Sequence, residues 1–259
     1  MGDMNWSSAI TEIGPNVIRL RGYPVEELMG KISFAEAIHL ALLGELPDPA
    51  TATILNAIFV SSVDHGTSPP SVLSTVTVAS TGAPLGAAVA AGILSISKFH
   101  GGAIEDSMKA ISEAVAAAKS KGLSFEDAAL ATFDSYKARG ARLPGFGHRL
   151  HTKDPRTTRL LQLVDDLGKA KDGLAMARAL ETTIAKVTGK PLPLNVDGAI
   201  AAVLLDLNVP PALANAFFMI ARLPGLVAHA HEERTRQKPM RQIHPTDTTY
   251  DGPAIRHLK

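Results

Sequence analysis

Apolar residues recur along most of this chain at intervals of three and four, the spacing that gathers them on one face of an α-helix. The stretch AIEDSMKAISEAVAAAKSKG shows this pattern at Ile104, Met108, Ile111 and Val115. A second stretch, DPRTTRLLQLVDDLG, shows it at Leu160, Leu163, Val164 and Leu167. Gly122 and Gly168 follow the last apolar positions and mark the expected helix ends. Both stretches are therefore predicted to be amphipathic helices.

Further segments carry helix signals of other kinds. SFEDAALATFDSYKARG opens with Ser124 and has Asp127 three residues later, a variant of the capping box. VDGAIAAVLLDLN and PPALANAFFMIARLPG are compact apolar segments, and prolines begin the second at a position that helices favour. The alternation typical of a strand is clear in NVIRLRGY, which predicts a small hairpin or an extended arm. The chain is therefore predicted to be all-α, with about ten helices.

Composition narrows the possible environments and partners. The 259 residues suit one large domain, or a major and a minor lobe. The 26 basic and 25 acidic residues form no long run of either sign, which argues against nucleic acid or an anionic membrane as the main partner. The absence of cysteine excludes disulfides, thiolate nucleophiles and cysteine-based zinc sites, and it fits a reducing cytoplasm.

The start of the chain and its apolar stretches give no sign of targeting or of a membrane span. MGDMNWSSAITEIGP lacks the basic start and apolar core of a signal peptide. The longest weakly polar stretch, LGAAVAAGILSIS, is shorter than the ~20 residues that cross a bilayer. We therefore expect this stretch to be a buried helix, and the protein to be cytoplasmic with no membrane partner.

The candidate chemistry lies between the helices, where His, Arg and Asp stand beside Gly and Pro. These segments are SVDHGTSPPS, SKFHGGAIED, ARLPGFGHRLHTKDPR, PLPLNVDG and IARLPG. His148 follows a side-chain-poor loop whose backbone a ligand can approach closely. Arg156 and Arg222 stand beside proline-marked turns, where arginines often clamp carboxylates, although both could be surface residues. His100 could equally pack or cap, and Asp197 could simply cap the helix that follows it.

Metal and nucleophile chemistry find little support in the sequence. His229 and His231 are two residues apart, so a helix would point them to different faces, and HEER lacks the second histidine of a zinc-protease helix. His148 and His151 have no third ligand nearby in the sequence. The chain contains neither a phosphate-binding loop nor a G-x-S-x-G nucleophile elbow. Acid–base chemistry by histidine, without a metal, is what remains.

Six motifs in order resemble the citrate synthase superfamily over about residues 21–241: RGYPVEELMGKISFAEAIHLALLGELP, VDHG, HGGAIE, LPGFGHRLHTKDPR, NVDGAIAAVLLDL and IARLPGLVAHAHE. Only about seventeen residues separate Pro47 from His65, where citrate synthases carry a much longer segment. This short form resembles the citryl-CoA lyases, including the C-terminal module of ATP citrate lyase. The resemblance implies a shortened citrate synthase-like helical fold. It also implies one domain over residues 1–259, within which a smaller helical lobe spans roughly 105–205.

The resemblance implies roles for individual residues. His100 matches the histidine that hydrogen-bonds the thioester oxygen of acetyl-CoA, and His148 the one that exchanges a proton with the oxygen on the oxaloacetate-derived carbon. Asp197 matches the carboxylate that exchanges a proton with the acetyl carbon. The citrate or oxaloacetate ligands would be His65, Arg156, Arg222 and Arg241. The loop that approaches coenzyme A would be Leu143, Pro144, Gly145, Phe146 and Gly147. Arg241 would act across a dimer interface, with Arg236 as its rival for that place.

The missing segment favours cleavage of citryl-CoA to acetyl-CoA and oxaloacetate through an acetyl-CoA enolate. Condensation of acetyl-CoA or another acyl-CoA with oxaloacetate, as in citrate synthase, stays open because both directions share one transition state. A non-catalytic partner subunit that keeps the fold is the second alternative. We expect no cofactor and no metal, since the coenzyme A thioester is the substrate, and we expect a homodimer or a higher homo-oligomer.

Overall fold

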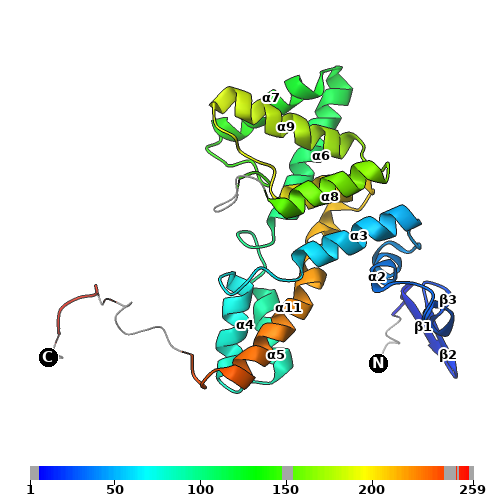
Figure 1. Ribbon diagram of the computed structural model, residues 1–259, viewed down its shortest axis with the longest axis vertical. Coiled ribbons are helices and arrows are strands. Elements are labelled where there is room, and N and C mark those ends of the chain that lie inside the picture. The colour runs from blue at the N-terminus through cyan, green and yellow to red at the C-terminus, as the bar shows by residue number, and fades with distance from the viewer. Residues whose placement is uncertain (1–5, 148–153, 242–248, 250, 257–259) are drawn as a thin grey trace. The chain divides into compact units, whose positions relative to one another are not determined.

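The computed structural model describes residues 6–147, 154–241, 249 and 251–256. Three short strands come first, followed by a series of helices (Figure 1). The strands are β1 (Thr11–Gly14), β2 (Val17–Leu20) and β3 (Tyr23–Pro24). The helices are α1 (Val25–Leu28), α2 (Phe34–Leu43), α3 (Pro49–Ser62), α4 (Pro70–Ser80), α5 (Leu85–Leu94), α6 (Ala103–Lys121), α7 (Phe125–Ala138), α8 (Pro155–Asp166), α9 (Asp172–Thr188), α10 (Val196–Asp206), the 3-10 turn η1 (Pro211–Leu213) and α11 (Ala214–Arg236). The predicted all-α class is confirmed.

The alternating segment near the start forms the small sheet, in the order β1-β2-β3. β1 and β2 are antiparallel, with Ile13 opposite Ile18 across the hairpin. Asn16 closes the turn with a positive φ of 59°, a conformation that asparagine tolerates better than most residues. The predicted hairpin is thereby confirmed.

Helix boundaries follow the capping rules closely. In α2, Glu36 N–H donates to Ser33 Oγ at 3.3 Å and Ser33 N–H donates to Glu36 Oε2 at 2.7 Å, which completes a capping box. The hydrogen bonds from Ser33 also hold the pKa of Glu36 below its usual value. The predicted cap of α7 is present, because Ser124 Oγ accepts the N–H of Asp127 at 3.0 Å. Local sequence therefore determines where these helices begin.

The chain folds into two compact units. The larger unit consists of Met1–Asp64 and Ile96–Arg222, and the smaller unit consists of His65–Ser95 and Leu223–Lys259. The small lobe expected at roughly 105–205 falls entirely within the larger unit, and its existence as a separate lobe stays a prediction.

Helix α10 lies at the centre of the larger unit. It contacts α6, α8 and α9, and α7 packs on α9. From Ala199 to Leu204 every residue of α10 is buried, which explains why VDGAIAAVLLDLN is apolar on all sides. Burial on every side fixes the helix firmly, so its first turn is a rigid platform for side chains.

The smaller unit is built around the packing of α4 on α5. Its core contains Val72, Val76, Val89 and Leu226. The helices approach closely at Gly92, where an added Cβ would lie 2.1 Å from Thr75 Oγ1. The expected helix in LGAAVAAGILSIS is confirmed as α5, but only one of its faces is buried: Leu94 is 83% exposed and Leu85 is 41% exposed.

Helix α11 differs from the expected turn at IARLPG. The helix continues through Pro224 to Arg236, although Pro224 has no N–H to donate to the preceding turn. Arg222 therefore lies inside a helix and not before a turn. Residues 211–236 are also long and apolar enough to cross a membrane by length and composition, a test that core helices of soluble proteins pass as well. Phe217 and Ala221 in this segment are buried in the described fold.

Candidate active site

Asn195 holds the beginning of α10. Its Oδ1 accepts the N–H of Gly198 at 3.0 Å, and its Nδ2 donates to the carbonyl oxygen of Gly147 at 2.9 Å. The helix cap is thus Asn195, and the alternative in which Asp197 serves as the cap is wrong. Asp197 lies in the first turn of a rigid helix and is available for another role.

The surroundings of Asp197 favour its protonated form. Burial raises the pKa of its carboxyl group because the carboxylate would lose its hydration. The positive charges of Arg156 and Arg222 oppose this increase, whereas the negative charge of Asp154 adds to it. The net direction is upward, so Asp197 keeps its proton to a higher pH than an ordinary aspartate.

Arg222 is the most deeply buried of the candidate ligands, with 2% of its surface exposed. Its Nε donates to the carbonyl oxygen of Ser62 at 2.9 Å, and its guanidinium lies 4.8 Å from the ring centroid of Phe218. Its Nη1 is buried and has no hydrogen-bond partner among the described residues. Burial also lowers the pKa of Arg222. An unpaired buried donor is costly, which favours an acceptor such as a carboxylate at this position.

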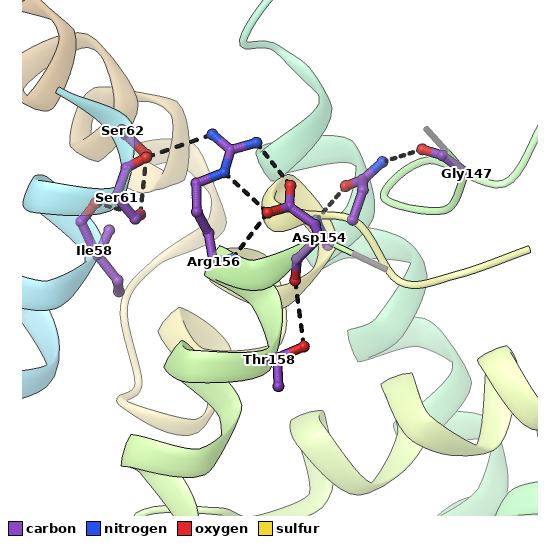
Figure 2. Close-up of polar contacts among 9 residues, drawn as sticks. Ile58, Ser61, Ser62, Gly147, Asp154, Arg156 and Thr158 are labelled. Atoms are coloured by element: carbon purple, nitrogen blue, oxygen red, sulfur yellow. Dashed lines mark hydrogen bonds and ion pairs between the residues drawn. The ribbon is translucent and has the colours of Figure 1, made fainter. Parts of the chain in front are cut away.

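Arg156 is held by a neighbouring carboxylate, as Figure 2 shows. Its Nε donates to Asp154 Oδ1 at 3.1 Å and its Nη2 donates to Asp154 Oδ2 at 2.7 Å, a bidentate geometry. Nη1 reaches the carbonyl oxygen of Ser61 at 3.4 Å. Arg156 from α8 and Arg222 from α11 thus donate to adjacent carbonyl oxygens at the end of α3, those of Ser61 and Ser62 respectively.

Asp154 has two tasks that the sequence analysis did not assign. It caps α8 by accepting the N–H of Arg156 at 2.9 Å, and it orients the side chain of the same residue. The order Asp-Pro-Arg is the signal that could have revealed it, because an aspartate before proline at a helix start is a strong cap. Phe218 was also missed, since an aromatic residue in an apolar helix reads as core.

His100 lies on a tight hairpin. The backbone N–H of His100 donates to the carbonyl oxygen of Ser97, and the N–H of Ser97 donates to the carbonyl oxygen of His100, both at 2.8 Å. The imidazole meets the Phe218 ring edge to face, with centroids 5.9 Å apart. Gly101 passes beneath the same ring with a positive φ of 74°, and an added Cβ would lie 2.5 Å from it. Only a glycine at position 101 therefore allows the His100 ring to pack against Phe218.

The loop Leu143–Gly147 is tied to the segment before α10. Asn195 N–H donates to the carbonyl oxygen of Gly145 at 3.0 Å, and Gly147 N–H donates to the carbonyl oxygen of Pro193 at 2.8 Å. Gly145 has a positive φ of 86°, and an added Cβ would lie 2.7 Å from the Cα of Gly198. The loop is therefore packed directly on the helix that carries Asp197.

A cavity of about 700 Å³ lies beside this loop. Phe133, Tyr136 and Phe146 supply aromatic surface, while Lys137 and Arg142 supply positive charge. Aromatic and cationic groups together suit a ligand that contains both a planar ring and anionic groups.

The remaining predicted residues are only partly placed. His148 lies outside the described residues. His65 belongs to the smaller unit, as do Arg236 and Arg241. Arg241 binds Glu233 through Nε at 3.0 Å and Nη2 at 2.5 Å, and Arg236 forms an ion pair with Glu232. The choice between these two arginines as the residue that acts across subunits therefore stays a prediction.

Known proteins resemble this chain over most of its length. Citryl-CoA lyase from Hydrogenobacter thermophilus superposes with a TM-score of 0.90 at 39% identity, covering 98% of this chain and 97% of that chain. ATP-citrate synthase beta chain protein 1 of Arabidopsis thaliana is 27% identical over 242 residues, which is 85% of this chain and 36% of the plant protein. The chain thus spans about a third of that relative's length.

A third relative shares the fold at lower identity. Citrate synthase from Thermoplasma acidophilum, solved with carboxymethyl coenzyme A and oxaloacetate, superposes with a TM-score of 0.71 at 24% identity. The superposition covers 87% of this chain and 58% of that one. The sequence model of the citrate synthase C-terminal domain matches residues 43–245. The resemblance inferred from the six motifs is thereby confirmed, and this chain belongs to the citrate synthase family, of which it is a short form.

Proposed function

We propose that the protein cleaves citryl-CoA to acetyl-CoA and oxaloacetate. Its similarity to the lyase of Hydrogenobacter thermophilus extends over nearly the whole of both chains. Both chains are short in comparison with the citrate synthase of Thermoplasma acidophilum, of which this chain covers 58%. Citryl-CoA is therefore the first substrate to test.

The observation that carries the proposal is the charge arrangement around Asp197. The positive charges of Arg156 and Arg222 act on its carboxyl group, yet burial keeps its pKa raised. The buried Nη1 of Arg222 calls for an anionic acceptor. Two guanidinium groups beside a protonated carboxyl group suit a substrate with free carboxylates and a carbon atom that must be protonated.

The proposed reaction begins at the tertiary hydroxyl group of citryl-CoA. His148 accepts the hydroxyl proton as the C–O bond becomes the keto group of oxaloacetate. The carbon–carbon bond breaks, and its electron pair moves into the enolate of acetyl-CoA. Asp197 then gives its proton to the enolate carbon, which becomes the methyl group. A raised pKa of Asp197 serves this last step because the residue must begin protonated.

His100 would stabilise the enolate by donating an N–H to its oxygen. A preorganised donor of this kind contributes ~3–4 kcal/mol to the transition state. The hairpin, Gly101 and the Phe218 ring provide that preorganisation. The proposed mechanism uses no metal and no cofactor besides the coenzyme A thioester itself.

Condensation of acetyl-CoA with oxaloacetate is the alternative, and the same residues would serve it. We test the two reactions separately by supplying purified protein with citryl-CoA, or with acetyl-CoA plus oxaloacetate, and separating the CoA species by chromatography. Cleavage produces acetyl-CoA from citryl-CoA, whereas a synthase releases free CoA. The Asp197→Asn variant is the control for both reactions. If neither acetyl-CoA nor free CoA forms with wild-type protein, the chain is the non-catalytic subunit instead.

We also propose that the protein acts as a homodimer or a higher homo-oligomer. Large apolar side chains are exposed on the smaller unit, with Leu94 83% exposed and Leu73 50% exposed. Exposed apolar side chains of this size can be buried where two subunits meet. Light scattering coupled to gel filtration measures the oligomeric state directly.

A further inference from the structure

Helix α6, which follows His100 directly, begins without a capping side chain of its own. Its cap position is Gly102. A Cβ at this glycine would lie 2.7 Å from the carbonyl oxygen of Ser97, so the tight hairpin excludes any residue that could cap. The free N–H groups of the first turn therefore need a partner from elsewhere in the chain.

Asn215, 110 residues away in the sequence, supplies this partner. The N–H of Glu105 donates to Asn215 Oδ1 at 3.1 Å, and Asn215 Nδ2 donates to Glu105 Oε2 at 3.2 Å. Glu105 is the third residue of α6, the position that closes a capping box. The pair thus repeats the reciprocal pattern of Ser33 and Glu36 in α2, but the capping side chain comes from a different helix. We call Glu105 and Asn215 the α6–α11 clamp.

The clamp occupies the same face of α11 as the residues that contact the candidate site. Phe218 and Arg222 follow Asn215 by three and seven residues, the spacing of one helical face. The Phe218 and His100 rings form a T-shaped pair, and the guanidinium of Arg222 lies over the Phe218 ring. A shift of α11 relative to α6 would therefore change the distance between His100 and Arg222.

The second oxygen of Glu105 strengthens the clamp. Glu105 Oε1 accepts from Lys109 Nζ at 2.6 Å, one turn further along α6. The two carboxylate oxygens of Glu105 thus accept hydrogen bonds from different partners. This fixes the rotation of the carboxylate that accepts the hydrogen bond from Asn215.

We propose that Glu105 and Asn215 are positioning residues that hold the His100 loop in register with Phe218 and Arg222 on α11. The catalytic consequence rests on the proposed function, in which His100 donates to the enolate oxygen. The positional consequence does not rest on it, so the two can be tested separately.

The positional test uses the full chain labelled with ¹³C in its histidine rings. The His100→Gln variant identifies the His100 signal, whose chemical shift reports the ring current of Phe218. We expect Asn215→Ala to move this signal toward the position of an unstacked histidine. Ser33→Ala is the matched control, because it breaks the equivalent box at α2 and should leave the His100 signal in place. An unchanged His100 signal in Asn215→Ala overturns the proposal, whatever reaction the protein catalyses.

The catalytic test compares kcat and KM for citryl-CoA well below the melting temperature. Asn215→Ala should lower kcat by about 10- to 100-fold with little change in KM, since a small displacement of a transition-state donor affects the chemical step. Ser33→Ala should keep wild-type kcat. If kcat falls equally in both variants, the clamp contributes only to stability and the proposal is wrong.

A swapped pair tests the reciprocal geometry itself. Asn215→Asp alone places a carboxylate against that of Glu105 and should be as impaired as Asn215→Ala. Adding Glu105→Gln exchanges the roles, so that the new amide at position 105 donates to the new carboxylate at position 215. The double variant should therefore recover both the His100 signal and most of kcat. A double variant no better than Asn215→Asp contradicts the clamp. If wild-type protein fails to cleave citryl-CoA while the His100 signal responds as expected, the proposed function falls and the positioning role stands.

Discussion

Asn195 and Asp197 divide between them two roles that the sequence alone could not separate. Asn195 Oδ1 accepts the N–H of Gly198 and caps α10, and Asp197, two residues later, carries the shifted pKa. The helix cap and the raised pKa thus belong to different side chains at the start of the same helix. Each can be removed without the other.

Asp197→Asn should strongly reduce the rate of catalysis and preserve the fold. Asparagine has nearly the same size as aspartate but cannot protonate the enolate carbon, so kcat should fall by about 10²- to 10⁴-fold. The free energy of unfolding should change little because the cap stays intact. Asn195→Ala removes the cap and should lower the free energy of unfolding by about 1 kcal/mol. Urea titrations and steady-state rates of both variants check the separation, and a nearly wild-type rate in Asp197→Asn would refute the mechanism.

Asp154→Asn should shift the pH dependence of cleavage. The negative charge of Asp154 raises the pKa of Asp197, so its removal lowers that pKa. The protonated form of Asp197 is then lost at a lower pH, and the alkaline decline of kcat moves in the same direction. Asparagine can still cap α8, which keeps the helix start intact. A profile of kcat against pH measures the shift, and a shift to higher pH would contradict this electrostatic account.

The sequence predicted the helices well because their signals are local. Capping residues, glycines after the last turn and the apolar period determined α6, α7 and α8 correctly. The continuation of α11 through Pro224 was missed. Proline inside a helix costs a backbone hydrogen bond, and the sequence does not show the tertiary packing that offsets this loss. The pairing of Glu105 with Asn215 was also invisible, because the two residues are 110 positions apart and only the fold brings them together.

Asp48 should make folding sensitive to acid. Its carboxylate accepts from Lys169 Nζ at 2.8 Å and caps α3. The hydrogen bond from Lys169 contributes most to holding the pKa of Asp48 well below the usual range. The stabilisation is fully present above the unfolded pKa of ~3.9 and is lost as the pH falls toward the folded value. Asp48→Asn should therefore be less stable than wild type at pH 7 by less than about 1 kcal/mol, because the pair is partly exposed. Urea unfolding at pH 7 and at pH 3 should show this difference shrinking with acid, and a constant difference would contradict the assignment.

Mixed oligomers test whether Arg241 serves a neighbouring subunit. If Asp197 of one subunit and Arg241 of another complete one site, Asp197→Asn and Arg241→Ala proteins should regain activity when their subunits exchange. Random exchange within a dimer leaves roughly a quarter of the sites intact. Arg236→Ala mixed with Asp197→Asn is the comparison that decides between the two arginines. Absence of recovery with Arg241→Ala, after exchange has been demonstrated by mass spectrometry, removes Arg241 from the shared site.

The last prediction separates His100 from His148 by following protons at carbon. In deuterated water with oxaloacetate present, Asp197 should exchange hydrogen at the methyl group of acetyl-CoA through the enolate. His100→Ala should suppress both this exchange and cleavage, by about 100- to 1000-fold, because both reactions pass through the enolate that His100 stabilises. His148→Ala should stop cleavage and retain weak exchange, since its proton goes to oxygen and not to carbon. Mass spectrometry of recovered acetyl-CoA gives the deuterium content. Full exchange in His100→Ala would show that the enolate forms without it, and its edge-to-face contact with Phe218 would then be a packing contact only.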